Sequence, residues 1–104
     1  TLYCSSVISS GDITGFSDRK LKDNLEVISN PLEKVSKLTG YTFDRIDLDN
    51  KRQTGIIAQD LLEVLPEAVV DVDGTLSVAY GNLVGLLIEA IKELNTKVEE
   101  LQGK

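Results

Sequence analysis

Residues 83–101 read LVGLLIEAIKELNTKVEEL, and this stretch shapes the fold more than any other in the chain. Its apolar residues recur at alternating steps of three and four, at Val84, Leu87, Ile91, Leu94, Val98 and Leu101. That spacing is the heptad seam of a helix that pairs with other helices. Nearly three heptads are marginal alone, so we expect this long helix to pair only alongside globular contacts. The mixed Val, Ile and Leu seam leaves the number of helices open.

The start of this helix has a wider apolar face, which also includes Leu83, Leu86, Ile88 and Ala90. We therefore expect this end to pack on a small domain. Just upstream, β-prone runs at 68–72 and 75–80 flank the pair Asp73-Gly74. Because that pair favours positive φ angles, the two runs predict a β-hairpin.

Two short helices are expected earlier in the chain. Residues 31–38 form the first, because Asn30 can cap it, Pro31 suits its first position and Glu33 stands at the capping-box position. The second covers 60–65 and stops at the proline that follows.

The segment between these helices contains the remaining strands. Residues 41–43 alternate like a half-buried strand, and 47–51 form a charged turn. The apolar run 54–59 fits either a buried strand or the lead into a helix. The expected fold class is α+β: a small mixed domain with short strands and a long C-terminal helix at 83–101.

Composition narrows the class of protein. The 104 residues suit one small domain, which is marginal alone and would gain burial by oligomerising. The net charge is −6, and no basic stripe exists for a phosphate backbone, which argues against nucleic acid. No apolar run is long enough for a bilayer and no secretory pattern occurs, so we expect no membrane partner and synthesis in the cytosol.

Residues 1–16, TLYCSSVISSGDITGF, are small, polar and β-prone. We expect short strands there, at the end of something larger. Because Thr1 is no initiator, we expect the chain to be part of a longer protein. Cys4, the only cysteine, excludes an intrachain disulfide and is expected to be a small buried side chain or a free terminal thiol.

The polar stretch that follows contains a candidate catalytic pair, Ser17 and Lys22. A serine needs a base before it becomes a nucleophile, and the chain has no histidine. On a regular helix, residues five apart point about 140° away from each other. The pair can therefore meet only in a bent or looped segment or between subunits. The spacing alone is more typical of a turn serine than of a nucleophile.

Other polar groups are less informative. Asp44, Asp47 and Asp49 lie close together without the spacing of a calcium loop, so no metal or cofactor is expected. Gly55 lies inside an apolar run, which indicates a bulge or a close backbone approach. The glycine either allows tight packing or exposes an N–H that could serve as an oxyanion donor. Gln53 and Gln59 flank it.

Four separated motifs together resemble the endosialidase-type intramolecular chaperone domain, which ends phage tailspikes and tail fibres. They are SDRKLKDN at 17–24, RQTGIIAQD at 52–60, LPEAV at 65–69 and SVAYGNLVGLLIEAIKEL at 77–94. The resemblance covers residues 17–101. It implies a homotrimer that aligns three fibre chains, assists their folding and then releases itself by autoproteolysis.

The resemblance also implies site residues. The family's serine nucleophile falls on Ser17 and its lysine partner on Lys22, with Asp18, Lys20 and Asn24 in the same motif. The family's glycine motif falls on residues 55–59, and a position where some members have histidine or glutamine is Gln53. Gly55, Asn24, Gln53 and Gln59 are then candidates for oxyanion binding or positioning.

The implied reaction is self-cleavage at Ser17. A free lysine titrates near 10.4, so burial or the nearby cations Arg19 and Lys20 would have to lower the pKa of Lys22 in the assembled trimer. The expected bond is Ser17–Asp18, with Phe16–Ser17 as the alternative. Residues 1–16 would be the stalk end, folding client and substrate, and 17–104 the chaperone.

Two other functions remain open: a trimerisation module that does not cleave, and a receptor-binding fibre tip. In the favoured function, the chain works in the host cytoplasm during virion assembly. The mature fibre then stays in the virion tail, and the chaperone is released.

Overall fold

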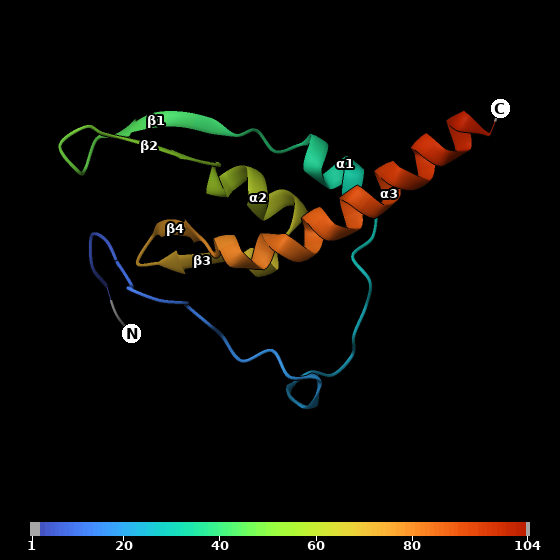
Figure 1. The fold of residues 1–104 in the computed structure, drawn as a ribbon. Helices are drawn as coiled ribbons and strands as arrows, with labels where there is room; N and C mark the ends of the chain where they lie inside the picture. The colour runs from blue at the N-terminus through green and yellow to red at the C-terminus, as the bar shows by residue number, and fades with distance from the viewer. Residues whose placement is uncertain (1–2, 104) are drawn as a thin grey trace.

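A computed structural model of the chain describes residues 3–103. It is a small α+β structure with two antiparallel hairpins and a long C-terminal helix, as the sequence predicts (Figure 1). The elements are α1 (Pro31–Ser36), β1 (Tyr41–Arg45), β2 (Lys51–Gly55), α2 (Ala58–Val64), β3 (Val69–Val72), β4 (Thr75–Val78) and α3 (Val84–Gln102). Short 3-10 turns occur at Arg19–Leu21, Pro66–Ala68 and Tyr80–Leu83.

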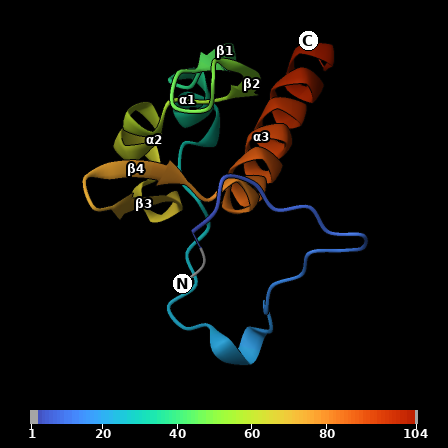
Figure 2. The ribbon, with the colours of Figure 1, turned by 90° about the vertical axis from the view of Figure 1, so that its left-hand side faces the viewer.

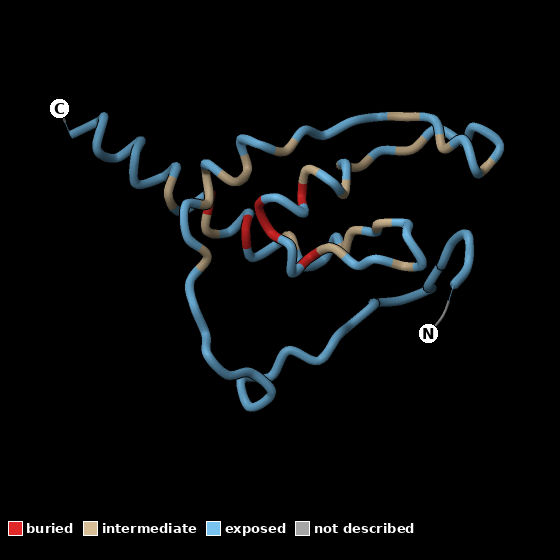
Figure 3. The backbone as a smooth tube through the Cα atoms, turned by 180° about the vertical axis from the view of Figure 1, so that it is seen from behind, coloured by how far each residue is buried: buried red, intermediate tan, exposed pale blue. Residues whose placement is uncertain are grey.

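The hydrophobic core is small and lies where α2 meets the start of α3 (Figure 3). Its buried side chains are Leu61, Val64, Leu65, Ala68, Leu86 and Ala90. Leu61 and Leu86 are completely buried, and each side chain contributes about 1.5–3 kcal/mol through removal from water. Of the wider apolar face predicted for the start of α3, Leu86 and Ala90 are buried and Leu83 is half-buried, whereas Ile88 is 50% exposed.

The second hairpin follows the turn chemistry of its sequence. Asp73 has φ 50° and Gly74 has φ 88°, the pair of positive angles that a two-residue hairpin needs. The Asp71 carboxylate accepts the Gly74 N–H at 2.8 Å. Both strands are shorter than 68–72 and 75–80, because 3-10 turns take up their outer ends.

The first helix begins at Pro31 as predicted, but it ends at Ser36 and its predicted cap is wrong. Asn30 is left-handed, with φ 49° and ψ 50°, and its side chain caps nothing. The Leu32 N–H instead donates to Oε1 of Glu93 on α3, at 3.2 Å. The N-terminus of α1 is thus satisfied by a residue far along the chain rather than by a local capping box.

The run 54–59 contains both of the alternatives that its sequence allowed. Strand β2 ends at Gly55, and α2 begins at Ala58 after two extended residues. The register pairs Tyr41 with Gly55 and Arg45 with Lys51. Residues 46–50 form the turn of this first hairpin.

The strands expected in 1–16 are absent from residues 3–16, and Thr1 and Leu2 lie outside the described residues. A strand needs a partner for its backbone groups, and the described chain places none beside this segment. Residues 3–27 are all exposed, including the free thiol of Cys4. They form an arm that loops out from the domain, with its 3-10 turn far from the two hairpins (Figures 1 and 2).

Helix α3 carries two different apolar stripes. One, with Leu86 and Ala90, is buried against the domain. The other is the predicted heptad seam, whose six side chains are 42–68% exposed. The radius of gyration is 16.8 Å, against about 13 Å for a compact domain of this length. The arm and the C-terminal part of α3 both extend away from the core, and their apolar side chains stay exposed in the single chain.

Candidate functional site

Ser17 and Lys22 are in contact within one chain. Nζ of Lys22 donates a hydrogen bond to Oγ of Ser17 at 2.7 Å. The residues between them form a 3-10 turn, Arg19–Leu21. The chain then leaves this turn through an extended Lys22, with φ −122° and ψ 143°. This is the bent geometry that a pair five residues apart requires, and no second subunit is needed to bring them together.

Asp18 builds the turn that joins the pair. Its carboxylate Oδ1 accepts the Lys20 N–H at 3.0 Å, which caps the turn. The Asp18 carbonyl accepts the Leu21 N–H, and the Arg19 carbonyl accepts the Lys22 N–H, each at 3.0 Å. The polar SDRKLK sequence thus has a local structural role, as a capped turn that returns Lys22 to Ser17.

The pair is exposed in the single chain, on the arm. In the structure the lysine ammonium donates to the serine oxygen, whereas a general base must accept the serine proton. Lys22 would therefore have to lose its own proton first. The 2.7 Å between the two atoms then suits a proton transfer from Ser17 to Lys22. The desolvation that turns a lysine into a base is not supplied by this chain alone.

The other four predicted site residues lie elsewhere. Gln53, on β2, accepts a hydrogen bond from Nη1 of Arg45 at 3.4 Å. Gln59, in the first turn of α2, lines the main cavity with Gly55. Asn24, with φ 53°, borders a smaller polar cavity beside the end of α2. Among residues 3–103, no hydrogen bond joins any of these four to Ser17 or Lys22.

Gly55 lies where another group packs closely against the backbone, as its place in an apolar run predicted. The hydroxyl of Tyr80 lies against it and accepts the Ile56 N–H at 3.1 Å. A Cβ at Gly55 would overlap that hydroxyl and lie 3.3 Å from Cζ of the same ring. The close-approach interpretation of Gly55 is confirmed, and its role as an oxyanion donor stays a prediction.

Tyr80 is a functional candidate that the sequence analysis missed. It belongs to the SVAYGNL motif, but its partner is 24 residues away, so no local pattern reveals the contact. The bond joins the end of the first hairpin to the 3-10 turn that enters α3. It therefore fixes the orientation of the hairpin relative to the long helix.

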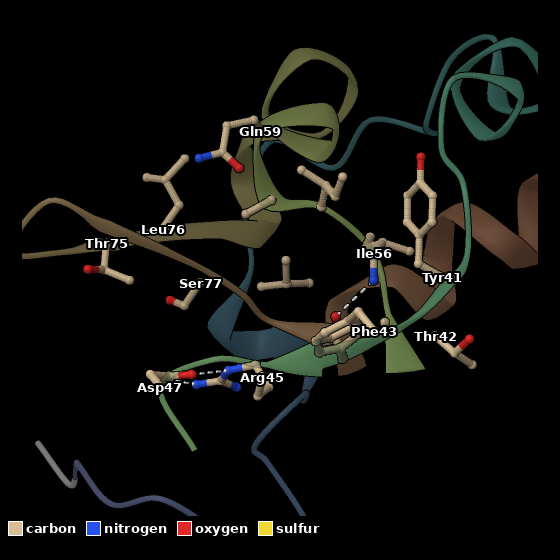
Figure 4. Close-up of a pocket in the computed structure, with 15 residues that line it drawn as sticks. Tyr41, Thr42, Phe43, Arg45, Asp47, Ile56, Gln59, Thr75, Leu76 and Ser77 are labelled. Carbon is tan, nitrogen blue, oxygen red and sulfur yellow. Dashed lines mark hydrogen bonds and ion pairs between the residues drawn. The ribbon is translucent and has the colours of Figure 1, made fainter. Parts of the chain in front are cut away.

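The main cavity is an open groove of about 820 Å³ between β1 and β4 (Figure 4). Phe43, Ile56, Leu76 and Val78 supply apolar lining, and Tyr41 and Tyr80 add aromatic rings with hydroxyls. The structure places no residue of the arm in this lining.

An ion pair at the edge of this groove holds two charges together. Nε and Nη2 of Arg45 each donate to a carboxylate oxygen of Asp47, both at 2.7 Å. This hydrogen bonding lowers the pKa of Asp47 and raises the pKa of Arg45. Within the described residues, no group of three or more acidic or thiol side chains is arranged to hold a metal ion.

Residues 17–70, just over half of the chain, match the model of a peptidase family described as chaperone of endosialidase. The match begins at Ser17. This chain belongs to that family. The predicted resemblance is therefore confirmed.

The chain is also similar to phage proteins named long tail fiber protein Gp37. It is 36% identical over 112 residues to that of Enterobacteria phage K3, covering 99% of this chain and 9% of that protein. For phage Ox2 the identity is 39% over 112 residues, covering 98% of this chain and 45% of that protein. For phage M1 the identity is 43% over 96 residues, covering 83% of this chain and 38% of that protein. The chain spans less than half of each of these relatives.

The family description names a chaperone, and the names of these relatives are those of tail fibre proteins. No helix in residues 3–103 combines the length and the apolar character needed to cross a membrane.

Proposed function

We propose that this chain is the C-terminal intramolecular chaperone of a phage tail fibre or tailspike, which trimerises, assists folding of the fibre and releases itself at Ser17. The observation that carries the proposal is the 2.7 Å contact between Lys22 Nζ and Ser17 Oγ. Family membership and the likeness to long tail fiber proteins support the chaperone part.

The proposed division of the chain falls at the same serine. Residues 1–16 are the end of the stalk, and 17–104 are the chaperone that leaves. The family match beginning at Ser17 supports this boundary. The work takes place in the host cytoplasm during virion assembly, and the fibre then remains in the virion tail.

In the proposed reaction, Lys22 loses its proton and then accepts that of Ser17. Oγ attacks a backbone carbonyl carbon, an ester bond forms, and the C–N bond of the peptide breaks. The lysine returns the proton to the departing amine, and water then hydrolyses the ester. Arg19 and Lys20 would favour the neutral lysine once the trimer encloses the arm.

The position of the cut depends on which serine attacks. Within one chain, Oγ of Ser17 reaches the Phe16 carbonyl through a five-membered ring, which cleaves Phe16–Ser17. Its own carbonyl would close a strained four-membered ring. A cut at Ser17–Asp18, the favoured bond, therefore needs the serine of a neighbouring subunit. Mass spectrometry of the fragments reports both the bond and the subunit arrangement.

Intact mass spectrometry of purified protein tests the proposal. We expect wild type to separate into two fragments at Ser17, and Ser17→Ala and Lys22→Ala to remain uncut trimers. The chain supplies a matched control pair, since Lys34 also donates to a serine five residues earlier, Ser29, at 3.4 Å. Ser29→Ala and Lys34→Ala should cleave normally. Equal cleavage in wild type and Ser17→Ala would refute the nucleophile, and normal cleavage of Lys22→Ala would refute the base.

A trimerisation module without cleavage is the second candidate function. The exposed heptad seam favours it, because that seam needs partners whether or not the serine reacts. A time course of the purified precursor on a denaturing gel distinguishes the two. A precursor that stays whole while trimeric would indicate the module alone.

A further inference from the structure

The groove beside β4 is bordered by the edge of that strand. All four residues of β4, Thr75–Val78, line it. Successive side chains of a strand point to opposite faces, so consecutive residues can share a lining only where the edge itself faces the space. Within residues 3–103 the β3–β4 sheet has two strands, which leaves β4 with a free outer edge.

The backbone groups on that edge can be identified. Val72 pairs with Thr75 across the two-residue turn, and Val70 pairs with Ser77. These are the hydrogen-bonded pairs of the ladder, and the Ala79 N–H continues the alternation by donating to the Ala68 carbonyl at 2.8 Å. Leu76 and Val78 therefore direct their N–H and C=O groups outward, along the groove.

The arm has apolar side chains that no other part of the described chain covers. Residues 3–16 contain exposed apolar side chains: Val7 at 64%, Ile8 at 93%, Ile13 at 79% and Phe16 at 99%. Only one residue of this segment, Asp12, is charged. Among the described residues that line the groove, only Arg45 and Asp47 are charged, and they are already paired with each other. An uncharged, β-prone strand matches such a groove in both polarity and backbone chemistry.

We propose that residues 5–16 of a second copy of this chain dock in the groove as an added strand on β4. The inference rests on the proposed function, in which copies assemble and residues 1–16 are the folding client. Hydrogen bonds to Leu76 and Val78 hold the strand, and the aliphatic side chains of the arm cover the apolar lining. Each chaperone would thereby hold the stalk end of a neighbouring copy, and that copy's Ser17 would follow the docked strand directly.

A second copy is the better occupant than the chain's own arm. Figure 1 shows the arm beyond the β3–β4 hairpin, on the side away from β1–β2, whereas the groove lies between β1 and β4. The exposed seam of α3 provides the contact that brings copies together. A two-stranded hairpin is marginal alone, so a third strand also stabilises β3–β4.

Cysteine cross-linking tests the docking in a Cys4→Ser, Ser17→Ala background, so that the arm stays attached and no other thiol reacts. One chain carries Ile13→Cys and the other Ser77→Cys, and the two are refolded together and treated with a short bismaleimide. We expect a covalent dimer on a denaturing gel. A chain with Thr96→Cys, on the exposed side of α3, replaces the Ser77→Cys chain as the control and should not link.

The outcomes separate the alternatives. A third chain that carries both Ile13→Cys and Ser77→Cys tests the alternative. A link inside that chain, with none between the two single-cysteine chains, would overturn docking by a second copy in favour of the chain's own arm. Absence of a link in trimeric protein would overturn docking altogether. Because every chain here is uncleavable, these results do not depend on self-cleavage, which the mass measurement tests separately.

Hydrogen exchange gives a second readout that a cross-link cannot mimic. In the same trimer, the Leu76 and Val78 amides should exchange about tenfold or more slowly than in an Ile8→Asp, Ile13→Asp variant. These substitutions lie on the exposed arm, so they leave the core intact. Equal exchange in the two proteins would contradict strand addition.

Discussion

A single tyrosine hydroxyl explains why glycine stands at position 55. Strand β2 ends there, and the Ile56 N–H has left the ladder before α2 begins. Tyr80 accepts that N–H at 3.1 Å, and the ring occupies the space that a side chain on Gly55 would need. The GIIAQ and SVAYGNL motifs are therefore two halves of one contact.

This contact predicts that substitutions at its two ends are not additive. Gly55→Ala should cost about 1–3 kcal/mol by overpacking, and Tyr80→Phe about 1 kcal/mol through the lost hydrogen bond. In the double variant the missing hydroxyl leaves room for the new methyl group, so its cost should fall well below the sum. Urea unfolding of the four proteins measures the coupling.

The control for this cycle is Tyr3→Phe, which removes a hydroxyl from an exposed tyrosine on the arm, away from Gly55. Combined with Gly55→Ala, it should be additive within about 0.5 kcal/mol. Additive costs in the Tyr80 cycle would show that the ring does not press on Gly55.

At the scale of an element, the first hairpin is braced near its turn by the two-pronged bond of Arg45 to Asp47. The hydrogen bonds lower the pKa of Asp47 in the folded state. A carboxylate with a lowered folded pKa contributes stability above its unfolded pKa, and this is lost as the pH falls through the folded pKa. The contribution is small, because both groups are exposed.

Removing the guanidinium should return Asp47 to ordinary behaviour. In Arg45→Gln, we expect the pKa of the Asp47 carboxyl to rise toward its usual value, as followed by NMR titration. Arg52→Gln is the matched control, since Arg52 pairs with Asp44 at 3.1 Å on the same hairpin. An Asp47 titration that is unchanged in Arg45→Gln would contradict the assigned cause.

Elements with local signals were predictable from the sequence, and those that depend on distant contacts were not. The Asp73-Gly74 turn and the heptad period of α3 each act within a few residues. The cap of α1 depends on Glu93, and the contact of Gly55 depends on Tyr80, so neither pattern could name its partner. The spacing of Ser17 and Lys22 showed the pair, but only the 3-10 turn shows how they meet.

At the scale of the whole molecule, α3 has two apolar stripes on different sides of the helix, one buried and one exposed. The stripe with Leu86 and Ala90 holds the domain, and the seam through Ile91 and Leu94 stays exposed. The domain can therefore fold without using up the surface through which copies would pair. The sequence predicted this division, because the apolar face is widest at the start of the helix and then narrows to the seam.

A charge placed on the seam should prevent assembly without unfolding the domain. Ile91 is 65% exposed in the single chain, so Ile91→Asp disturbs no buried contact there, but in a trimer it would place three carboxylates at one level of the coil. We expect monomers by light scattering with the circular dichroism of a folded domain. Thr96→Asp, with the same charge away from the seam, should remain trimeric.

The same pair of variants tests whether assembly activates cleavage. Ile91→Asp leaves the Ser17–Lys22 contact untouched, because that contact forms within one chain on the separate arm. If the trimer supplies the desolvation that the lysine needs, or the attacking serine of a neighbouring subunit, the Ile91→Asp monomer should stay uncut while Thr96→Asp cleaves at the wild-type rate. A monomer that cleaved as fast as wild type would show that the exposed pair suffices, and cleavage could then not report correct assembly.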